Sequence, residues 1–387
     1  MSEFAPLDSG VLPAGVRSRF VDGVNGLRVH VLEAGFETPG RPCILLLHGF
    51  PELAWSWRRL LGPLARAGFH VVAPDQRGYG RTTGWSGDYE GDLREFRPLN
   101  VLLDTLALAA RLGHETVAAV VGHDFGSPVA AWGALIRPDV FRSVVLMSAP
   151  FAGPPTLALE SGRTAADRSR AAEDIRVALA RLERPRKHYQ WYFTTRTANA
   201  DMWRCAEGVD AFLRAYFHHK SADWTQNRPF RLESWTAEEL AKMPTYYVMD
   251  LDQDMAATVA REMPTDAEIT ACRWLPDSEL RVYGDEYKRT GFQGGLNWYR
   301  VWSDVTYTAD LQVFSGRTID VRSMFIAGAS DWGVYQEPGA FERMQDVCTQ
   351  LVGCHLVEGA GHWVQQEQPE QVVELLRGFL SGSRTRQ

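Results

Sequence analysis

Three side chains that could carry out nucleophilic and acid–base chemistry stand after predicted strands. Asp124 lies in the run Gly122-His123-Asp124-Phe125-Gly126, Asp331 follows Gly328-Ala329-Ser330, and His362 ends the run Gly359-Ala360-Gly361-His362. A small-x-nucleophile-x-small run between a strand and a helix is typical of a sharp turn that exposes a nucleophile, here Asp in place of Ser. The ordinary pKa of Asp is near 3.9, so Asp124 would be a carboxylate at neutral pH without an activating base. His362, oriented by Asp331, would then be free to deprotonate water.

A carboxylate nucleophile restricts the substrate. Its attack on an acyl carbon would give a reactive anhydride, whereas its attack on an sp³ carbon gives an ordinary ester. The sequence therefore favours a substrate with an electrophilic alkyl carbon and a leaving group.

The elements around these residues read as an α/β fold. Unbroken apolar runs, typical of strands buried on both faces, occur at 43–47, 69–73, 116–121 and 143–147, and the pattern resumes with strands predicted at 323–327 and 354–358. Residues 27–33 alternate after an Asn25-Gly26 turn, which predicts an antiparallel hairpin. Helical spacing covers 53–66, 98–111, 127–137, 340–350 and 369–380. We expect a mostly parallel sheet with helices on both faces.

Between the two groups of strands, residues 165–304 carry several aromatic-rich helical stretches and no comparable strand run. The simplest account is a sheet interrupted by a helical insertion and then completed. We therefore predict a core of residues 1–150 and 309–387 and a helical cap of residues 151–308.

The position of the second carboxylate follows by elimination, because chemistry in open α/β sheets gathers at the carboxyl ends of the strands. The strand that ends at Met147 is followed by no carboxylate, and Asp320 precedes its strand. Asp331 is therefore the predicted second carboxylate.

For Asp124, the alternative to a nucleophile is a plain helix N-cap.

The predicted strand 43–47 runs into His48-Gly49-Phe50-Pro51-Glu52. In α/β-hydrolases the loop after this strand gives one backbone N–H to the oxyanion hole, and the residue after the nucleophile gives the other. Phe50 and Phe125 would be these two residues. The alternative is a simple strand-to-helix turn.

These segments together resemble the soluble epoxide hydrolases of the α/β-hydrolase fold. The resemblance rests on HGFPE at 48–52, DQRGYG at 75–80, GHDFG at 122–126, YQWYF at 189–193, LNWYR at 296–300, the Asp331 turn and GHWVQQEQP at 361–369. It implies that two cap tyrosines, Tyr189 and Tyr299, donate hydrogen bonds to the epoxide oxygen, with Tyr192 as a possible substitute for Tyr189.

The same resemblance assigns His48, Pro51, Gln190 and Trp363 to the substrate pocket. One residue departs from the family, which usually has Trp after the nucleophile where this chain has Phe125. The backbone N–H is unaffected, but we expect a smaller side chain on the floor of the pocket.

Two other functions share parts of this pattern. A dehalogenase could use the same Asp-His-Asp set, but haloalkane dehalogenases usually carry Asn and Trp where this chain has Phe50 and Phe125, and fluoroacetate dehalogenases carry Arg after the nucleophile. For the cap tyrosines the alternative is aromatic packing. A ligand-binding receptor on this fold would show a broken catalytic set or no oxyanion loop, and neither is seen.

Composition limits the partners of the chain. The 387 residues carry a net charge of −7 without a basic run, which argues against nucleic acid. No apolar run approaches the roughly 20 residues needed to cross a bilayer, and the start of the chain lacks the pattern of a signal peptide. Five scattered cysteines form no disulfide framework or zinc pattern, so we expect a reducing cytoplasm and no metal or cofactor. Seven of the 13 tryptophans fall in the predicted cap, which favours an apolar or aromatic epoxide.

Overall fold

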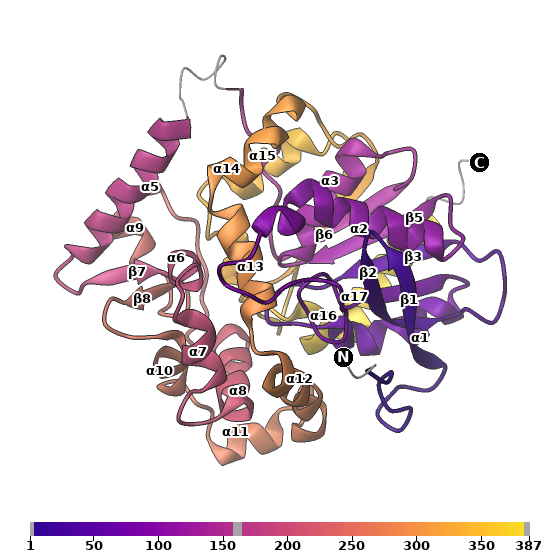
Figure 1. Cartoon of the computed structure of the whole chain (residues 1–387), viewed down its shortest axis with the longest axis horizontal. Helices are drawn as coiled ribbons and strands as arrows, with labels where there is room; N and C mark the ends of the chain where they lie inside the picture. The colour runs from indigo at the N-terminus through magenta and orange to yellow at the C-terminus, as the bar shows by residue number, and fades with distance from the viewer. Residues whose placement is uncertain (1–3, 158–164, 383–387) are drawn as a thin grey trace.

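The computed structural model describes residues 4–157 and 165–382 (Figure 1). An eight-stranded sheet forms its centre, with the strand order β1-β2-β4-β3-β5-β6-β9-β10. The bounds are β1 Val16–Val24, β2 Leu27–Ala34, β3 Cys43–Leu47, β4 His70–Pro74, β5 Val117–His123, β6 Ser143–Met147, β9 Arg322–Gly328 and β10 Leu351–Val357. The first two strands form the predicted antiparallel hairpin, and β2 pairs antiparallel with β4. All further pairs are parallel, so the predicted α/β-hydrolase class is confirmed.

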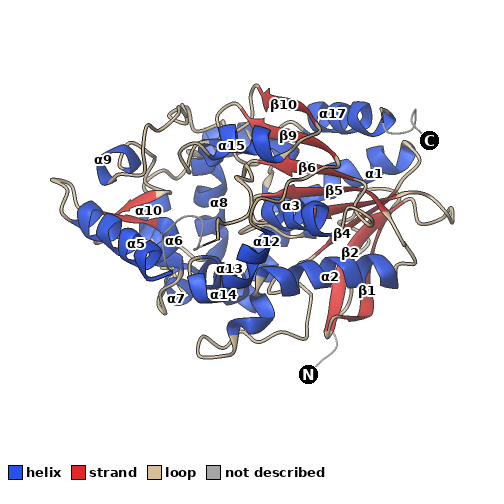
Figure 2. Cartoon of the chain, turned by 90° about the horizontal axis from the view of Figure 1, so that it is seen from above, coloured by secondary structure: helices blue, strands red, loops and turns tan. Residues whose placement is uncertain are grey.

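Helices cover both faces of the sheet. Helix α1 (Arg58–Arg66) contacts α17 (Pro369–Ser381), and α2 (Pro98–Arg111) contacts α3 (Gly126–Ile136); Figure 2 shows these two pairs on opposite sides of the strands. Every residue of β3 and of β6 is buried, which explains their unbroken apolar sequence. The remaining helices of this part are α15 (Ala340–Val347) and α16 (Val364–Glu367), with short 3₁₀ turns at Ala54–Trp57, Leu93–Phe96, Ala309–Phe314 and Trp332–Val334.

A second group of helices lies beside the sheet and extends from the left to the middle of Figure 1. It comprises α5 Ala165–Ala180, α6 Tyr189–Phe193, α7 Ala198–Trp203, α8 Val209–Lys220, α9 Ala237–Leu240, α10 Met255–Ala260, α11 Asp266–Ala271, α12 Asp277–Thr290, α13 Gln293–Trp302 and α14 Val305–Thr308. The division into a core (1–150 and 309–387) and a cap (151–308) stays a prediction, and residues 158–164 of that cap lie outside the described residues.

One part of this region differs from our expectation. A two-stranded antiparallel sheet joins β7 (Arg186–His188) to β8 (Val248–Asp250), where no strand was predicted. Each strand has three residues, and three residues are too few to show an alternating pattern. The small sheet matters for the site because β7 runs directly into Tyr189.

Candidate active site

The turn after β5 holds Asp124 in a conformation that only a tightly packed backbone can impose. Asp124 has φ of 51°, in the left-handed region that L residues rarely adopt. A Cβ atom at Gly122 would lie 1.9 Å from the carbonyl oxygen of Gly126, and one at Gly126 would lie 2.1 Å from that of Leu47. Both flanking glycines are therefore required by close backbone approach, and the turn presents the carboxylate beyond the end of the sheet.

His362 lies between the two predicted carboxylates. Its Nε2 is 3.5 Å from Oδ2 of Asp124, and its Nδ1 is 3.1 Å from Oδ1 of Asp331. The same Asp331 oxygen accepts the N–H of Gly333 at 2.7 Å, which fixes the carboxylate. His362 and Asp331 are buried, whereas 13% of the Asp124 side chain is exposed. The three side chains thus form a linear set with its outer carboxylate accessible.

The predicted oxyanion loop faces the same carboxylate. The N–H of Phe50 donates to Oδ1 of Asp124 at 2.9 Å, and the N–H of Phe125 has no partner among the described residues. A Cβ atom at Gly49 would lie 2.3 Å from Cβ of Asp124, so the loop can approach this closely only with glycine there. Two N–H groups are therefore available next to the Asp124 carboxyl.

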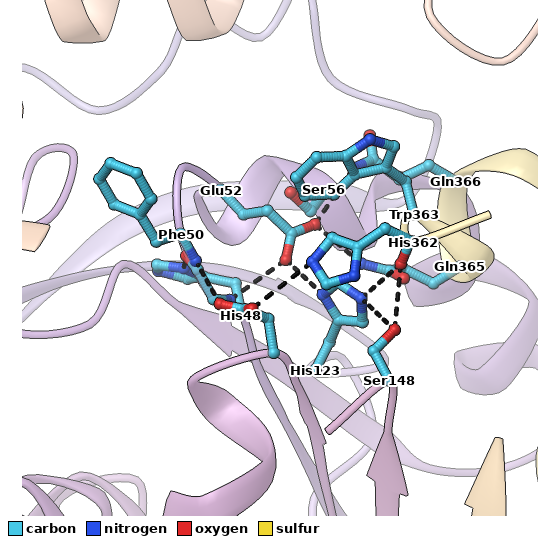
Figure 3. A network of polar contacts seen from close by, with 12 residues as sticks. His48, Phe50, Glu52, Ser56, His123, Ser148, His362, Trp363, Gln365 and Gln366 are labelled. Carbon is cyan, nitrogen blue, oxygen red and sulfur yellow. Dashed lines mark hydrogen bonds and ion pairs between the residues drawn. The ribbon is translucent and has the colours of Figure 1, made fainter. Parts of the chain in front are cut away.

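A buried polar network lies beneath these residues (Figure 3). His123 approaches Oε2 of Glu52 at 2.6 Å through Nδ1, and its Nε2 is 2.7 Å from the carbonyl oxygen of His362 and 3.0 Å from Oγ of Ser148. Burial alone would lower the pKa of His123, but the Glu52 carboxylate raises it overall. Glu52 also accepts the N–H of Gly49 at 3.1 Å, so this ion pair connects the oxyanion loop to the backbone of His362.

The roles of Glu52 and His123 were missed by sequence reasoning. Both stand in the quoted motifs HGFPE and GHDFG, next to residues that were assigned. Both are titratable residues in motifs at the ends of predicted strands. This signal could have placed them near the site, because the strand ends meet at one edge of the sheet.

The charges near Asp124 keep it ionised. Burial would raise its pKa, but His362 and the ammonium of Lys220 hold the pKa of Asp124 well below its usual range. Lys220 is 3% exposed, and its Nζ lies 5.0–5.8 Å from the ring centres of Tyr216, Tyr246, Tyr247 and Trp363. Burial lowers the pKa of Lys220, while the nearby carboxylates of Asp124 and Asp331 act to raise it.

Both predicted cap tyrosines face Asp124 across a cavity. Tyr189 begins α6 and Tyr299 lies in α13; their ring centres are 5.9 Å apart, and both side chains line the same cavity as Asp124. Tyr192 is absent from that lining and donates its hydroxyl to Asp201 at 2.8 Å. The structure thus brings Tyr189, and not Tyr192, to the nucleophile. Burial raises the pKa of Tyr189 and of Tyr299 well above the usual value, so both remain hydrogen-bond donors.

The cavity has a volume of about 730 Å³, and several aromatic side chains lie in its walls. Among its lining residues are Phe125, Trp132, Phe151, Trp191, Trp235 and Trp302. The predicted pocket residue Gln190 is part of this lining. The ring centres of Phe125 and Tyr299 are 4.6 Å apart, so the Phe125 side chain forms the floor between nucleophile and cap.

Three other predicted pocket residues, His48, Pro51 and Trp363, do not line this cavity. His48 is fully buried, where its Nδ1 lies 2.8 Å from the carbonyl oxygen of Gly49 and its Nε2 accepts the N–H of Gln76. The indole of Trp363 donates to the carbonyl oxygen of Phe217 at 2.8 Å. His48 and Trp363 therefore bond to the backbone of neighbouring segments, a role that a sequence motif alone does not distinguish from a place in the pocket wall.

No group of three or more His, Cys, Asp or Glu side chains in residues 4–157 and 165–382 is arranged to hold a metal ion. Within the same ranges no helix has the length and apolar character to cross a membrane.

Comparison with known proteins assigns this arrangement to a family. A family model described as alpha/beta hydrolase fold matches residues 42–369. Epoxide hydrolase A of Mycobacterium tuberculosis is 34% identical over 378 residues, which cover 94% of this chain and 97% of that protein. Epoxide hydrolase B of the same organism is 31% identical, with 93% and 97% covered. The solved structure of an epoxide hydrolase from an endophytic Streptomyces superposes with a TM-score of 0.76 at 32% identity, covering 96% of this chain and 97% of the other.

Proposed function

The chain belongs to the epoxide hydrolases of the α/β-hydrolase fold, and from this premise we propose that it opens an epoxide to a vicinal diol through a covalent ester on Asp124. The observation that carries the proposal is the placement of His362, with Nε2 3.5 Å from Asp124 and Nδ1 3.1 Å from Asp331, beside a nucleophile that shares its cavity with two tyrosines.

In the first step a carboxylate oxygen of Asp124 attacks one ring carbon of the epoxide, and the C–O bond of that carbon breaks. The charge that develops on the ring oxygen is met by the hydroxyl groups of Tyr189 and Tyr299, one of which transfers its proton. Asp124 needs no base for this attack because it is already ionised. The product of this step is an alkyl ester of Asp124 that carries one hydroxyl group.

In the second step His362 removes a proton from water, and the resulting hydroxide attacks the carboxyl carbon of Asp124. The N–H groups of Phe50 and Phe125 hold the oxyanion of the tetrahedral intermediate. Its collapse expels the second diol oxygen, which takes the proton from the imidazolium of His362. The carboxyl proton of Asp124 returns to the tyrosinate, so the enzyme is restored and one water has been added to the epoxide.

Isotope labelling tests this route. In a single turnover with excess enzyme in ¹⁸O-water, we expect label in Asp124 and unlabelled first diol, since the first oxygen comes from the carboxylate. Label found directly in the first diol would mean that water attacks the epoxide and would overturn the ester mechanism.

We propose further that the substrate is apolar or aromatic and that the enzyme works in the cytoplasm without a cofactor. The aromatic cavity walls support the substrate class, and the five free cysteines, Cys43, Cys205, Cys272, Cys348 and Cys354, support a reducing compartment. A turnover screen of aryl, alkyl and trans-disubstituted epoxides with chiral product analysis tests the first point, and cell fractionation tests the second. With a polar, hydroxylated epoxide added to this screen, its turnover at the same rate as the aryl epoxides would contradict the substrate class.

A further inference from the structure

The backbone on both sides of His362 is fixed by a side chain that the proposed mechanism does not use. The carboxyl group of Glu367, at the end of α16, accepts the N–H of Gly361 at 2.9 Å through Oε2 and the N–H of Trp363 at 2.9 Å through Oε1. His362 is thus held by its two neighbours, from a residue five positions along the chain.

The same carboxyl group also binds the chain just after helix α8. Oε2 of Glu367 also accepts the N–H of Ala222 at 2.8 Å, just after the end of α8. Next to it, the N–H of His362 donates to the carbonyl oxygen of Lys220 at 2.9 Å. One direct hydrogen bond, from His362 to Lys220, and three to the carboxyl group of Glu367 therefore connect residues 220–222 with the turn 361–363.

The two segments are also in direct backbone contact. A Cβ atom at Gly361 would lie 2.5 Å from the carbonyl carbon of Ser221 and 2.6 Å from the backbone nitrogen of Ala222. Glycine at position 361 permits this approach, and Glu367 supplies the acceptors that the facing N–H groups require.

We propose that Glu367 is a positioning residue that locks the His362 turn against the end of α8, so that the imidazole stays between Asp331 and Asp124. This inference rests on the proposed two-step function, because only the second step needs His362 as a base. A misplacement of catalytic groups by about 1 Å can slow a reaction about 10²-fold.

The chemistry of the side chain is specific. Three N–H donors need two acceptor oxygens, and a glutamine at this position offers one oxygen and turns an NH₂ group toward at least one donor. Burial raises the pKa of Glu367 to about 8, and the N–H groups of Ala222, Gly361 and Trp363 act in the opposite direction.

The test separates the two chemical steps in Glu367→Gln. We expect alkylation of Asp124 to stay within about threefold of wild type, while hydrolysis of the ester slows about 10- to 100-fold. The matched control is Glu370→Gln, which makes the same acid-to-amide replacement at an exposed position in the first turn of α17 and is expected to change neither step. Rapid-quench single turnovers with mass detection of the ester give both rates.

Equal slowing of both steps, or hydrolysis at the wild-type rate, would overturn the positioning role. If Glu367→Gln does not fold, Glu367→Asp serves instead, since it keeps both oxygens but withdraws them by one methylene; a wild-type hydrolysis rate in this variant would count equally against the proposal. The measurement on the wild-type enzyme separates failure of the proposed function from failure of the role of Glu367. Absence of the ester in wild type overturns the proposed function, whereas a wild-type ester with normal hydrolysis in the variant overturns the role of Glu367 alone.

Discussion

The hydroxyl group of Tyr189 donates a hydrogen bond to Oε1 of Gln336 at 3.1 Å, in the cavity above the nucleophile. The hydroxyl of Tyr299 has no such partner among the described residues. The two tyrosines are therefore unequal before substrate binds: Tyr299 can donate at once, whereas Tyr189 must first give up a bond worth about 0.5–1.5 kcal/mol net.

From this inequality we predict that Tyr299→Phe slows alkylation more than Tyr189→Phe. Phe keeps the packing of both rings, so the difference reports the hydroxyl groups. Stopped-flow alkylation rates of the two variants measure it, and the reverse order would contradict the prediction. In a Gln336→Met background the effect of Tyr189→Phe should grow, because Tyr189 is then free to donate from the start.

The double variant Tyr189→Phe with Tyr299→Phe should lose more than one donor's contribution to alkylation. Removal of one preorganised donor to a developing oxyanion typically slows a reaction about 10²–10³-fold, and in each single variant the remaining tyrosine should soften that loss. With both removed, the alkoxide would face apolar rings. Alkylation near the wild-type rate in the double variant would show that the tyrosines only pack.

We expect alkylation to show no decline on the basic side up to about pH 10, the ordinary pKa of tyrosine. Burial raises the pKa of both Tyr189 and Tyr299, so their neutral, donating forms persist above the pH at which a free tyrosine ionises. The lowered pKa of Asp124 means that its carboxylate is present throughout the same range. Single-turnover alkylation rates measured between neutral pH and pH 10 test this, and a fall with an apparent pKa below 10 would contradict it.

Substitution of the glycines at the nucleophile turn should destabilise the protein. In Gly122→Ala the new Cβ atom would meet the carbonyl oxygen of Gly126 at 1.9 Å, a clash with backbone that no side-chain rotation relieves. Overpacking typically reduces the free energy of unfolding by about 1–3 kcal/mol. The control is Gly378→Ala in α17, where nothing lies within 4 Å of the new atom and a gain of about 0.4–1 kcal/mol is expected. Thermal and urea unfolding compare the two, and equal stability of both variants would contradict the account.

The catalytic residues that follow predicted strands could be found from the sequence. Asp124 and Asp331 follow the buried strands β5 and β9, His362 follows the edge strand β10, and parallel strands bring their carboxyl ends to one edge, so the set could be predicted without coordinates. Features that depend on distant segments could not be predicted in this way. The bond between Tyr189 and Gln336 joins residues 147 positions apart, and nothing local in either segment signals it. His48 and Trp363 were assigned to the pocket because their motifs border the site, but a motif does not state which side of its loop faces the substrate.

Asp124 and His362 should act in different steps, Asp124 in ring opening and His362 in hydrolysis of the ester. His362→Gln removes the base that activates water but leaves an ionised Asp124, so this variant should still open the epoxide and then stall as the ester. Intact-protein mass spectrometry should show the enzyme mass raised by one substrate; an unmodified mass together with abolished ring opening would count against the two-step scheme. Asp331→Asn should slow the same hydrolytic step, because Oδ1 of Asp331 orients the imidazole at 3.1 Å and an amide there can favour the wrong tautomer. Hydrolysis at the wild-type rate in Asp331→Asn would place the orienting carboxylate elsewhere, whereas ester accumulation in both variants would link the geometry of the Asp124, His362 and Asp331 set to the second step.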